Sequence, residues 1–146
     1  MDNISLKALA KINLGLDVVR RRDDGYHEVR MIMQTINLFD RLEIKKIKES
    51  AIKIHTNLFF LPVNENNLVY KAAKLLIDEF GIQEGVSVGL TKKIPVAAGM
   101  AGGSTDAAAM LFGMNRLFGL GLSKKQLMER GVKIGADVPY CIMRGT

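Results

Sequence analysis

The stretch from Pro95 to Asp106 contains the residues whose types and spacing most directly predict chemistry. It reads Pro-Val-Ala-Ala-Gly-Met-Ala-Gly-Gly-Ser-Thr-Asp and joins a predicted strand to a predicted helix. Glycines let backbone amides approach an anion closely, and a helix start adds unpaired N–H groups and the positive end of its dipole. The hydroxyls of Ser104 and Thr105 are placed to donate to phosphate oxygens or to help hold Mg²⁺. The pattern therefore predicts a phosphate-binding loop.

Two common phosphate loops do not fit this stretch. It holds neither the Gly-Lys-Ser/Thr of a Walker loop nor the Gly-x-Gly-x-x-Gly of dinucleotide-binding folds. The competing interpretation is a tight turn whose small residues serve only the packing of the helix against the strand. The large number of small residues, together with two hydroxyl residues, favours the phosphate loop.

Lys11 and Asp137 form a second candidate pair. Lys11 lies on the polar face of a predicted first strand, beside Asn13, and Asp137 follows a predicted helix end. Phosphoryl transfer needs a group that orients or deprotonates the attacking hydroxyl and a cation that stabilises charge. Taken singly, the lysine fits a solvated surface charge and the aspartate before Val-Pro fits a turn former. The pair gains its meaning only in combination with a phosphate loop.

Tyr26 and His27 stand immediately behind the turn Asp23-Asp24-Gly25. An aromatic ring next to an imidazole can stack on a heterocycle and hydrogen-bond its edge. A half-buried hairpin pair explains the same two residues equally well. The neighbouring run Arg20 to Arg22 lies beside two aspartates and has no interleaved aromatic residue, so it reads as a solvated charge run rather than a nucleic-acid patch.

Alternating apolar residues predict the strands that would position these groups. From Ile4 to Val18 every even-numbered residue is apolar, which is the period of a strand. Extended runs are also predicted over 29–39, 42–47, 51–56 and 85–94, with a hairpin tip at Asp40-Arg41 and a strand-like segment over 140–143. The first third of the chain thus predicts a mainly antiparallel sheet.

Capping residues and apolar stripes predict three helices. The first is capped by Asn66 or Asn67 and stopped by Gly81. The second covers 107–118, has Ser104 and Thr105 as candidate caps, and is apolar enough to be buried on most sides. The third starts at a capping box of Ser123 and Gln126 and reaches Gly135.

The overall composition is that of one soluble domain. The 146 residues are 48% hydrophobic and 25% charged, and the net charge of +6 permits an anionic partner. The single cysteine cannot close an internal disulfide, and two histidines are too few for a histidine-rich metal site. The N-terminus reads as neither a signal peptide nor a membrane anchor, so we expect a cytoplasmic protein. The elements together predict an α+β domain with helices packed on a mostly antiparallel sheet.

These motifs resemble those of the galactokinase, homoserine kinase, mevalonate kinase and phosphomevalonate kinase superfamily. The stretch from Pro95 to Thr105 matches its Pro-x-x-x-Gly-Leu-Gly/Ala-Gly/Ser-Ser signature, with Met100 and Thr105 where Leu and Ser are usual. Within the superfamily the likeness is greatest to the branch that phosphorylates a cytidylyl sugar alcohol in the non-mevalonate route to isoprenoid precursors. The stretches that carry it are Ala10 to Leu14, Asp24 to His27, Asn67-Leu68 and Gly135 to Pro139.

The resemblance implies a role for each candidate residue. Asp137 would be the general base that takes the proton of the substrate hydroxyl, and Lys11 would stabilise the developing charge. Asn13, Tyr26 and His27 would lie near the cytidylyl substrate, with Tyr26 stacking on cytosine, and Asn67, Leu68 and Lys92 near the adenine. ATP, with Mg²⁺, would lie along Pro95, Val96, Ala97, Ala98, Gly99, Met100, Ala101, Gly102, Gly103, Ser104 and Thr105.

The resemblance also implies a fold and a domain arrangement. Residues 1–146 would form an N-terminal domain like one of a small-subunit ribosomal protein, with two layers and a left-handed βαβ crossover. The family's C-terminal domain is absent from the chain, so we expect a truncated form that tends to form a homodimer through the face left open. The expected partner is a small-molecule substrate, with no nucleic acid and no membrane.

Two other classes of function stay open at this point. A non-catalytic remnant of the kinase fold that binds a nucleotide or a protein would retain the same motifs. An RNA-binding domain of the ribosomal-protein type would explain the basic composition, but not the combination of Lys11, His27 and Asp137.

Overall fold

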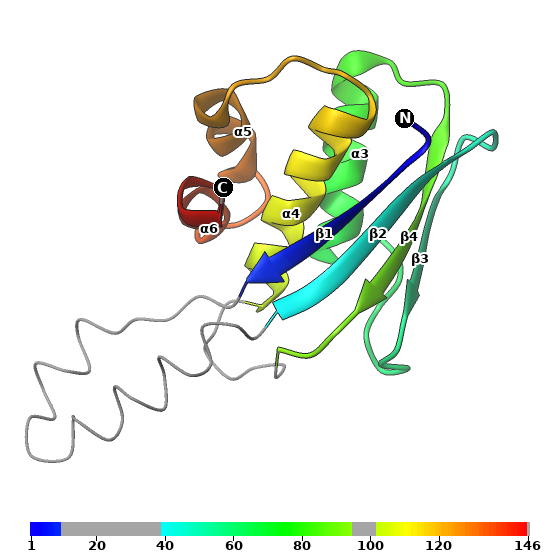
Figure 1. The fold of residues 1–146 in the computed structure, drawn as a ribbon, viewed down its shortest axis with the longest axis vertical. Coiled ribbons are helices and arrows are strands. Elements are labelled where there is room, and N and C mark those ends of the chain that lie inside the picture. Colours follow the sequence, from blue (N-terminus) through cyan, green and yellow to red (C-terminus); the bar gives the residue numbers. More distant parts are fainter. Residues whose placement is uncertain (10–38, 95–101, 146) are drawn as a thin grey trace, which may run out of the picture.

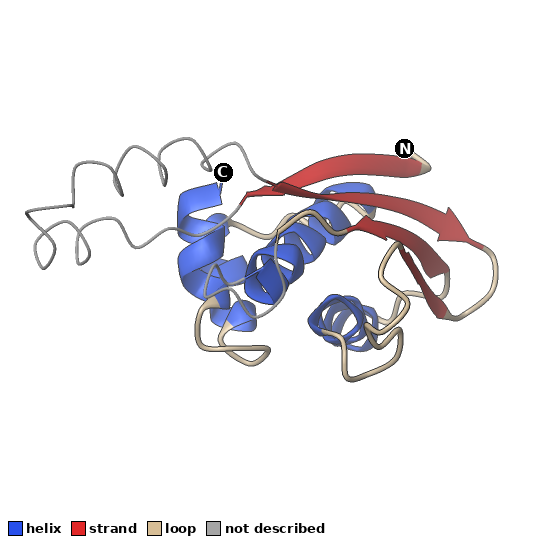
Figure 2. Ribbon diagram, turned by 90° about the horizontal axis from the view of Figure 1, so that it is seen from below, coloured by secondary structure: helices blue, strands red, loops and turns tan. Residues whose placement is uncertain are grey.

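The computed structural model describes residues 1–9, 39–94 and 102–145 of the chain (Figure 1). These residues form two layers, in which four strands make one sheet and four helices cover one of its faces (Figure 2). No described helix lies on the opposite face of the sheet. The predicted α+β domain, with helices packed on a sheet, is confirmed.

The sheet has the order β1-β2-β4-β3. Its strands are β1 (Asn3–Leu9), β2 (Phe39–Ile47), β3 (Ile52–Thr56) and β4 (Gly85–Thr91). The pairs β1–β2 and β2–β4 are antiparallel, whereas β3 and β4 are parallel. The parallel neighbours are joined through helix α3, which makes the predicted βαβ unit.

The side chains of the sheet alternate between the helices and the opposite face. On β2 the residues Asp40, Leu42 and Ile44 are buried while Arg41 and Glu43 are exposed. Val88 and Leu90 of β4 lie opposite Ile44 and Leu42 in the ladder and are buried with them. This period-two pattern places the apolar side chains of the sheet in the core beneath the helices.

The helices are α3 (Leu68–Phe80), α4 (Gly102–Leu117), α5 (Lys124–Gly131) and α6 (Val138–Gly145). The side chain of Asn67 accepts a hydrogen bond from the Val69 amide at the start of α3, and Gly81 ends that helix with φ of 60°. Of the two predicted caps, the structure therefore selects Asn67. The Ser123–Gln126 capping box at the start of α5 is confirmed.

Helix α4 is the centre of the core. Met110, Leu111 and Met114 are completely buried on it, as the apolar composition predicted. It lies so close to the sheet that a Cβ added at Gly113 would be 2.6 Å from the Ile44 side chain and 2.7 Å from that of Leu6. Glycine at this point allows the close approach of α4 to β1 and β2, because a side chain would have to displace the ends of the Ile44 and Leu6 side chains.

Several local predictions were wrong. Asp40-Arg41 is not a hairpin tip, because β2 continues through both residues, which pair with Ala8 and Lys7 of β1. Segment 140–143 belongs to α6 and is not a strand. Its buried residues, Val138, Cys141 and Ile142, recur at the spacing of a helix.

The predicted ends of three elements also differ from the structure. Helix α4 begins at Gly102, so Ser104 and Thr105 lie inside its first turns and do not cap it. Strand β4 ends at Thr91 and α5 at Gly131, both earlier than predicted. The predicted continuation of the first strand to Val18 and the run 29–38 lie outside the described residues.

Candidate active site

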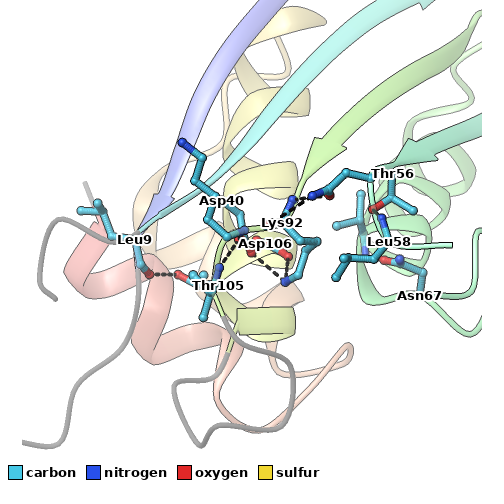
Figure 3. Close-up of polar contacts among 12 residues, drawn as sticks. Leu9, Asp40, Thr56, Leu58, Asn67, Lys92, Thr105 and Asp106 are labelled. Atoms are coloured by element: carbon cyan, nitrogen blue, oxygen red, sulfur yellow. Dashed lines mark hydrogen bonds and ion pairs between the residues drawn. The ribbon is translucent and has the colours of Figure 1, made fainter. Parts of the chain in front are cut away.

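Three ionisable side chains meet in the interior, next to the predicted phosphate loop (Figure 3). The Nζ of Lys92 lies 2.7 Å from Oδ2 of Asp40 and 2.7 Å from Oδ2 of Asp106. Asp40 is near the start of β2, Lys92 directly follows β4, and Asp106 is near the start of α4. Only 0%, 9% and 2% of the surface of Asp40, Lys92 and Asp106 is exposed. We call these three residues the buried triad.

Asp40 is the fully paired member of the triad. Its Oδ1 accepts hydrogen bonds from the backbone amides of Lys93, at 2.6 Å, and Ile94, at 2.8 Å. Burial acts to raise the pKa of Asp40, but the hydrogen bonds it receives outweigh burial and hold the pKa below its ordinary value. Asp40 is therefore the carboxylate that stays charged.

Asp106 is in a different environment. Its Oδ2 contacts Lys92, but its Oδ1 is buried without a hydrogen-bond partner. Burial raises the pKa of Asp106 to about 9, the hydrogen bond with Asp40 adds to the increase, and Lys92 opposes it only partly. The pKa of Lys92 is raised despite its burial, because both carboxyl groups favour its charged form. Near neutral pH the triad thus holds one carboxylate, one ammonium and one neutral carboxyl.

Part of the predicted phosphate loop lies within the described residues, at the start of α4. Gly103 is exposed and Ser104 is half-buried, so both can be reached from solvent. The Thr105 hydroxyl points inward and donates to the Leu9 carbonyl oxygen at 2.6 Å. That hydrogen bond ties the start of α4 to the end of β1 (Figure 3). Pro95 to Ala101 lie outside the described residues.

The structure brings the residues predicted near adenine to the same end of the molecule. Leu68 lies against the start of α4, because a Cβ added at Gly103 would be 3.6 Å from its side chain. Asn67 caps α3 and also donates to the Pro62 carbonyl oxygen. The amide of Lys92 donates to Oδ1 of Asn57 and its carbonyl oxygen accepts from Nδ2, so the Lys92 backbone is paired as well as its side chain.

Asp137 is exposed and stands directly before α6, where its carbonyl oxygen accepts the Cys141 amide at 3.2 Å. Of the other predicted site residues, Lys11, Asn13, Tyr26 and His27 lie outside the described residues.

A cavity of about 290 Å³ lies between β1, α4 and α6. Lys7 and Leu9 line it from β1, Thr105 from α4, and Cys141 from α6. The cavity is thus bordered by the end of the strand that leads to Lys11, the start of α4 and the helix that Asp137 precedes.

Positive charge gathers near the same end of the sheet. The charged groups of Lys7, Arg41 and Lys93 lie 4.9, 5.8 and 5.5 Å from the centre of the Phe39 ring. Cations over an aromatic face are attracted by its electron density. Three cations around one ring give this end of the molecule a local positive potential that favours anionic ligands.

The sequence did give a signal for the buried triad, although the predictions missed Asp40, Asp106 and Asn57. Asp40 is separated from Leu42 and Ile44 by an even number of positions along β2, which places it on the same face of the strand as these apolar residues. Asp106 lies near the start of an almost wholly apolar helix. A charged residue in register with a buried apolar face must find a partner in the interior. Which partner it finds depends on the fold.

Comparison with known proteins places the chain in a family. The model for the N-terminal domain of GHMP kinases matches residues 67–145, which include α3, β4, the predicted phosphate loop with its described end at the start of α4, and Asp137. The chain belongs to the GHMP kinases.

Similar curated GHMP kinases share one name. A protein named 4-diphosphocytidyl-2-C-methyl-D-erythritol kinase from Lachnospira eligens has 62% sequence identity to this chain over 100% of the chain's length. A protein of the same name from Alkaliphilus metalliredigens has 53% identity over 99% of the chain's length. The chain spans about half the length of these relatives, 51% of the first and 50% of the second.

Solved structures agree with this fold. A crystal structure of 4-(cytidine 5'-diphospho)-2C-methyl-D-erythritol kinase matches 96% of this chain and 49% of its own, with a TM-score of 0.70 and 28% identity. Homoserine kinase from Cytophaga hutchinsonii matches 92% of this chain and 41% of its own, with a TM-score of 0.71 and 19% identity, which shows the fold alone. The predicted resemblance to this kinase family is confirmed.

Within the described residues, no helix is long and apolar enough to cross a membrane.

Proposed function

We propose that the protein containing this chain phosphorylates the hydroxyl of 4-diphosphocytidyl-2-C-methyl-D-erythritol with ATP, and that the chain supplies the nucleotide-binding half of the site. The names of the similar GHMP kinases support this substrate and its place in isoprenoid biosynthesis. The proposed ligands are soluble metabolites, so the proposal includes a cytoplasmic location and no nucleic-acid partner.

One observation carries the proposal. The start of α4, the end of β1 and helix α6 meet around a single cavity, and the Thr105–Leu9 hydrogen bond fixes two of these elements to each other. The phosphate loop leads into the first element, Lys11 follows the second and Asp137 precedes the third. In this proposal, the groups required for phosphoryl transfer adjoin, along the chain, three elements that border the cavity.

The start of α4 is suited to bind the phosphates of ATP. The first N–H groups of an α-helix have no partner within the helix, and they point toward an anion placed at its N-terminus. Exposed Gly103 lets such an anion approach, and the Ser104 hydroxyl beside it can donate. The cations around Phe39 would attract the nucleotide to this end of the molecule.

A magnesium ion would enter this site with ATP rather than be held by the protein alone. Among the described residues, no group of three or more His, Cys, Asp or Glu side chains could hold a metal ion. Mg²⁺ at nucleotide sites is bound by phosphates, waters and only one or two protein groups. The Ser104 hydroxyl fits such a contact, whereas Asp106 does not, because Lys92 and burial hold its carboxyl inside. Bound Mg²⁺ would neutralise charge on the phosphates.

Asp137 is proposed as the general base. It is exposed at the edge of the cavity-lining helix α6, where a substrate hydroxyl can reach it. In this role its carboxylate takes the proton of the hydroxyl as the hydroxyl oxygen attacks the γ-phosphorus, and the bond between that phosphorus and the β–γ bridging oxygen breaks, so that ADP leaves. Lys11 would stabilise the developing charge.

The test joins this chain to the second half of the Lachnospira eligens relative and measures phosphorylation of the cytidylyl substrate. We expect Asp137→Asn to lower turnover about a hundredfold or more, the usual effect of removing a positioned base. The matched control is Asp78→Asn, which changes an exposed aspartate on α3 and leaves turnover unchanged. Equal turnover of the Asp137 variant and the unaltered fusion would refute the assignment. A fusion that binds ATP but phosphorylates nothing would support the non-catalytic alternative instead.

A further inference from the structure

The buried triad connects the two described ends of the chain between which the phosphate loop runs. On the entry side, Asp40 Oδ1 accepts the backbone amides of Lys93 and Ile94, the last two described residues before the loop. On the exit side, Asp106 belongs to α4, which begins at Gly102. The Nζ of Lys92 bridges Asp40 and Asp106 and so links the two sides.

We propose that Asp40, Lys92 and Asp106 are positioning residues for nucleotide binding, because they set the distance between the strand that enters the phosphate loop and the helix that leaves it. This inference rests on the proposed function in so far as the loop binds ATP. None of the three residues needs to touch the nucleotide.

The geometry favours positioning over a purely stabilising role. Charges taken into an interior lose their hydration, and a well-packed apolar cluster is often at least as stable as a buried ion pair. The hydrogen bonds of 2.6–2.8 Å that two successive amides donate to one carboxylate instead fix the direction of the backbone at Lys93 and Ile94. A phosphate loop needs fixed ends, since its amides bind an anion only when they all point toward it.

The two carboxyl groups have different roles. Asp40 uses both oxygens as acceptors and has to be charged to bind two amides and an ammonium group strongly. Asp106 has one oxygen without a partner, and ionising it would give the triad a net negative charge in the interior. Asp106 is therefore the neutral link between Lys92 and α4. A neutral side chain of the same shape should be able to replace it.

The test compares two variants at position 106 in the 146-residue protein. Asparagine keeps the shape of the neutral carboxyl, and its oxygen can accept from Lys92. Leucine fills a similar volume but cannot accept from Lys92, and it leaves Asp40 and Lys92 as a balanced buried pair. A purely structural role predicts that leucine is tolerated, since apolar replacement in a core is often neutral.

Binding of a non-hydrolysable ATP analogue with Mg²⁺ is measured by calorimetry for each variant. We expect Asp106→Asn to retain the affinity of the unaltered protein and Asp106→Leu to lose about tenfold or more, because the hydrogen bond from the Lys92 ammonium group that links it to α4 is gone. Melting curves check that both variants are folded at the temperature of the titration. Nucleotide affinity of Asp106→Leu equal to that of the unaltered protein, or equal losses for Asn and Leu, would overturn the proposal.

A second measurement does not depend on nucleotide binding. Asp40→Asn should speed amide hydrogen exchange at Lys93 and Ile94 by about tenfold or more, while the amides of the β2–β4 ladder keep their protection. Unchanged exchange at Lys93 and Ile94 would overturn the role of Asp40. If the unaltered chain does not bind the ATP analogue, its proposed role as the nucleotide-binding half fails, and the exchange rates still decide whether the triad holds the entry to the loop.

Discussion

Asp106 makes the folding of this chain sensitive to pH. Burial raises the pKa of its carboxyl to about 9 in the folded state, far above the ordinary value of 3.8 that applies to the unfolded chain. Between these two values the folded protein holds a proton that the unfolded chain has released. Stability therefore falls as pH rises through this range. Asp40 acts in the opposite direction: its pKa is lowered on folding, so its contribution is lost only as pH falls toward its own pKa.

The first prediction at the scale of residues follows from this difference. Asp106→Asn removes the titrating proton but keeps the shape and the hydrogen bonds of the neutral side chain. We expect the stability of the variant relative to the unaltered protein to increase steadily from about pH 6 to about pH 9, because only the unaltered protein must hold or lose the Asp106 proton. Urea unfolding at several pH values in this range measures the difference. Stability differences that are the same at every pH would show that Asp106 is ionised in the folded state.

The limit of sequence reasoning at this scale is set by contacts between distant residues. The types of Lys11, Asp137 and the glycines predicted phosphate chemistry because their roles depend on local spacing or on a recognisable motif. The buried triad joins residues that are 14 and 52 positions apart, and no local pattern shows that Asp40 will face Lys92. From the sequence, Asp40 and Asp106 could be detected only as charged residues at positions where the pattern expects apolar ones. The residues with which they pair could not be predicted.

Helices whose ends are marked by capping residues were predicted more accurately than segments without such residues. Helix α3 was predicted correctly because Asn67 and Gly81 mark both its ends, and α5 begins at its predicted capping box. Segment 140–143 was misread because four apolar and aromatic residues are too few to separate a strand from a helix. The deciding information was the burial of Val138, Cys141 and Ile142 against α4, which is a tertiary contact.

Helix α3 offers a prediction at the scale of the element. Asn67→Ala removes the hydrogen bond to the Val69 amide and the bond to the Pro62 carbonyl oxygen. We expect a loss of about 1 kcal/mol or somewhat more in the free energy of unfolding, the usual effect of removing an N-cap. The adjacent Asn66→Ala is the matched control, since Asn66 is exposed and does not cap the helix. Denaturant unfolding of the two variants measures this, and equal losses would contradict the assignment of the cap.

At the scale of the whole molecule, the described helices cover one face of the sheet (Figure 2). The cavity of the proposed site is lined by residues of β1, α4 and α6. The core is continuous from β1 through β4 and includes residues of α3, α4, α5 and α6. A single continuous core is the condition for independent folding of a domain. The proposed site is different, because the chain spans only about half the length of its relatives, and we expect residues of their second half to enclose the substrate.

The last prediction is that the 146-residue chain folds cooperatively but phosphorylates the cytidylyl substrate at least about a hundredfold more slowly than its fusion with the second half of the Lachnospira eligens relative. Folding needs only the core that the chain already has. Phosphoryl transfer needs the hydroxyl and the γ-phosphate held in line in a site that excludes water. Tyr140 and Met143 of α6, 40% and 51% exposed, also leave apolar surface open to solvent, so we expect the chain alone to self-associate as its concentration rises. A melting curve, sedimentation at several concentrations and an ATP-consumption assay measure these properties. Turnover by the chain alone that equals that of the fusion would show that this half of the enzyme forms a complete site.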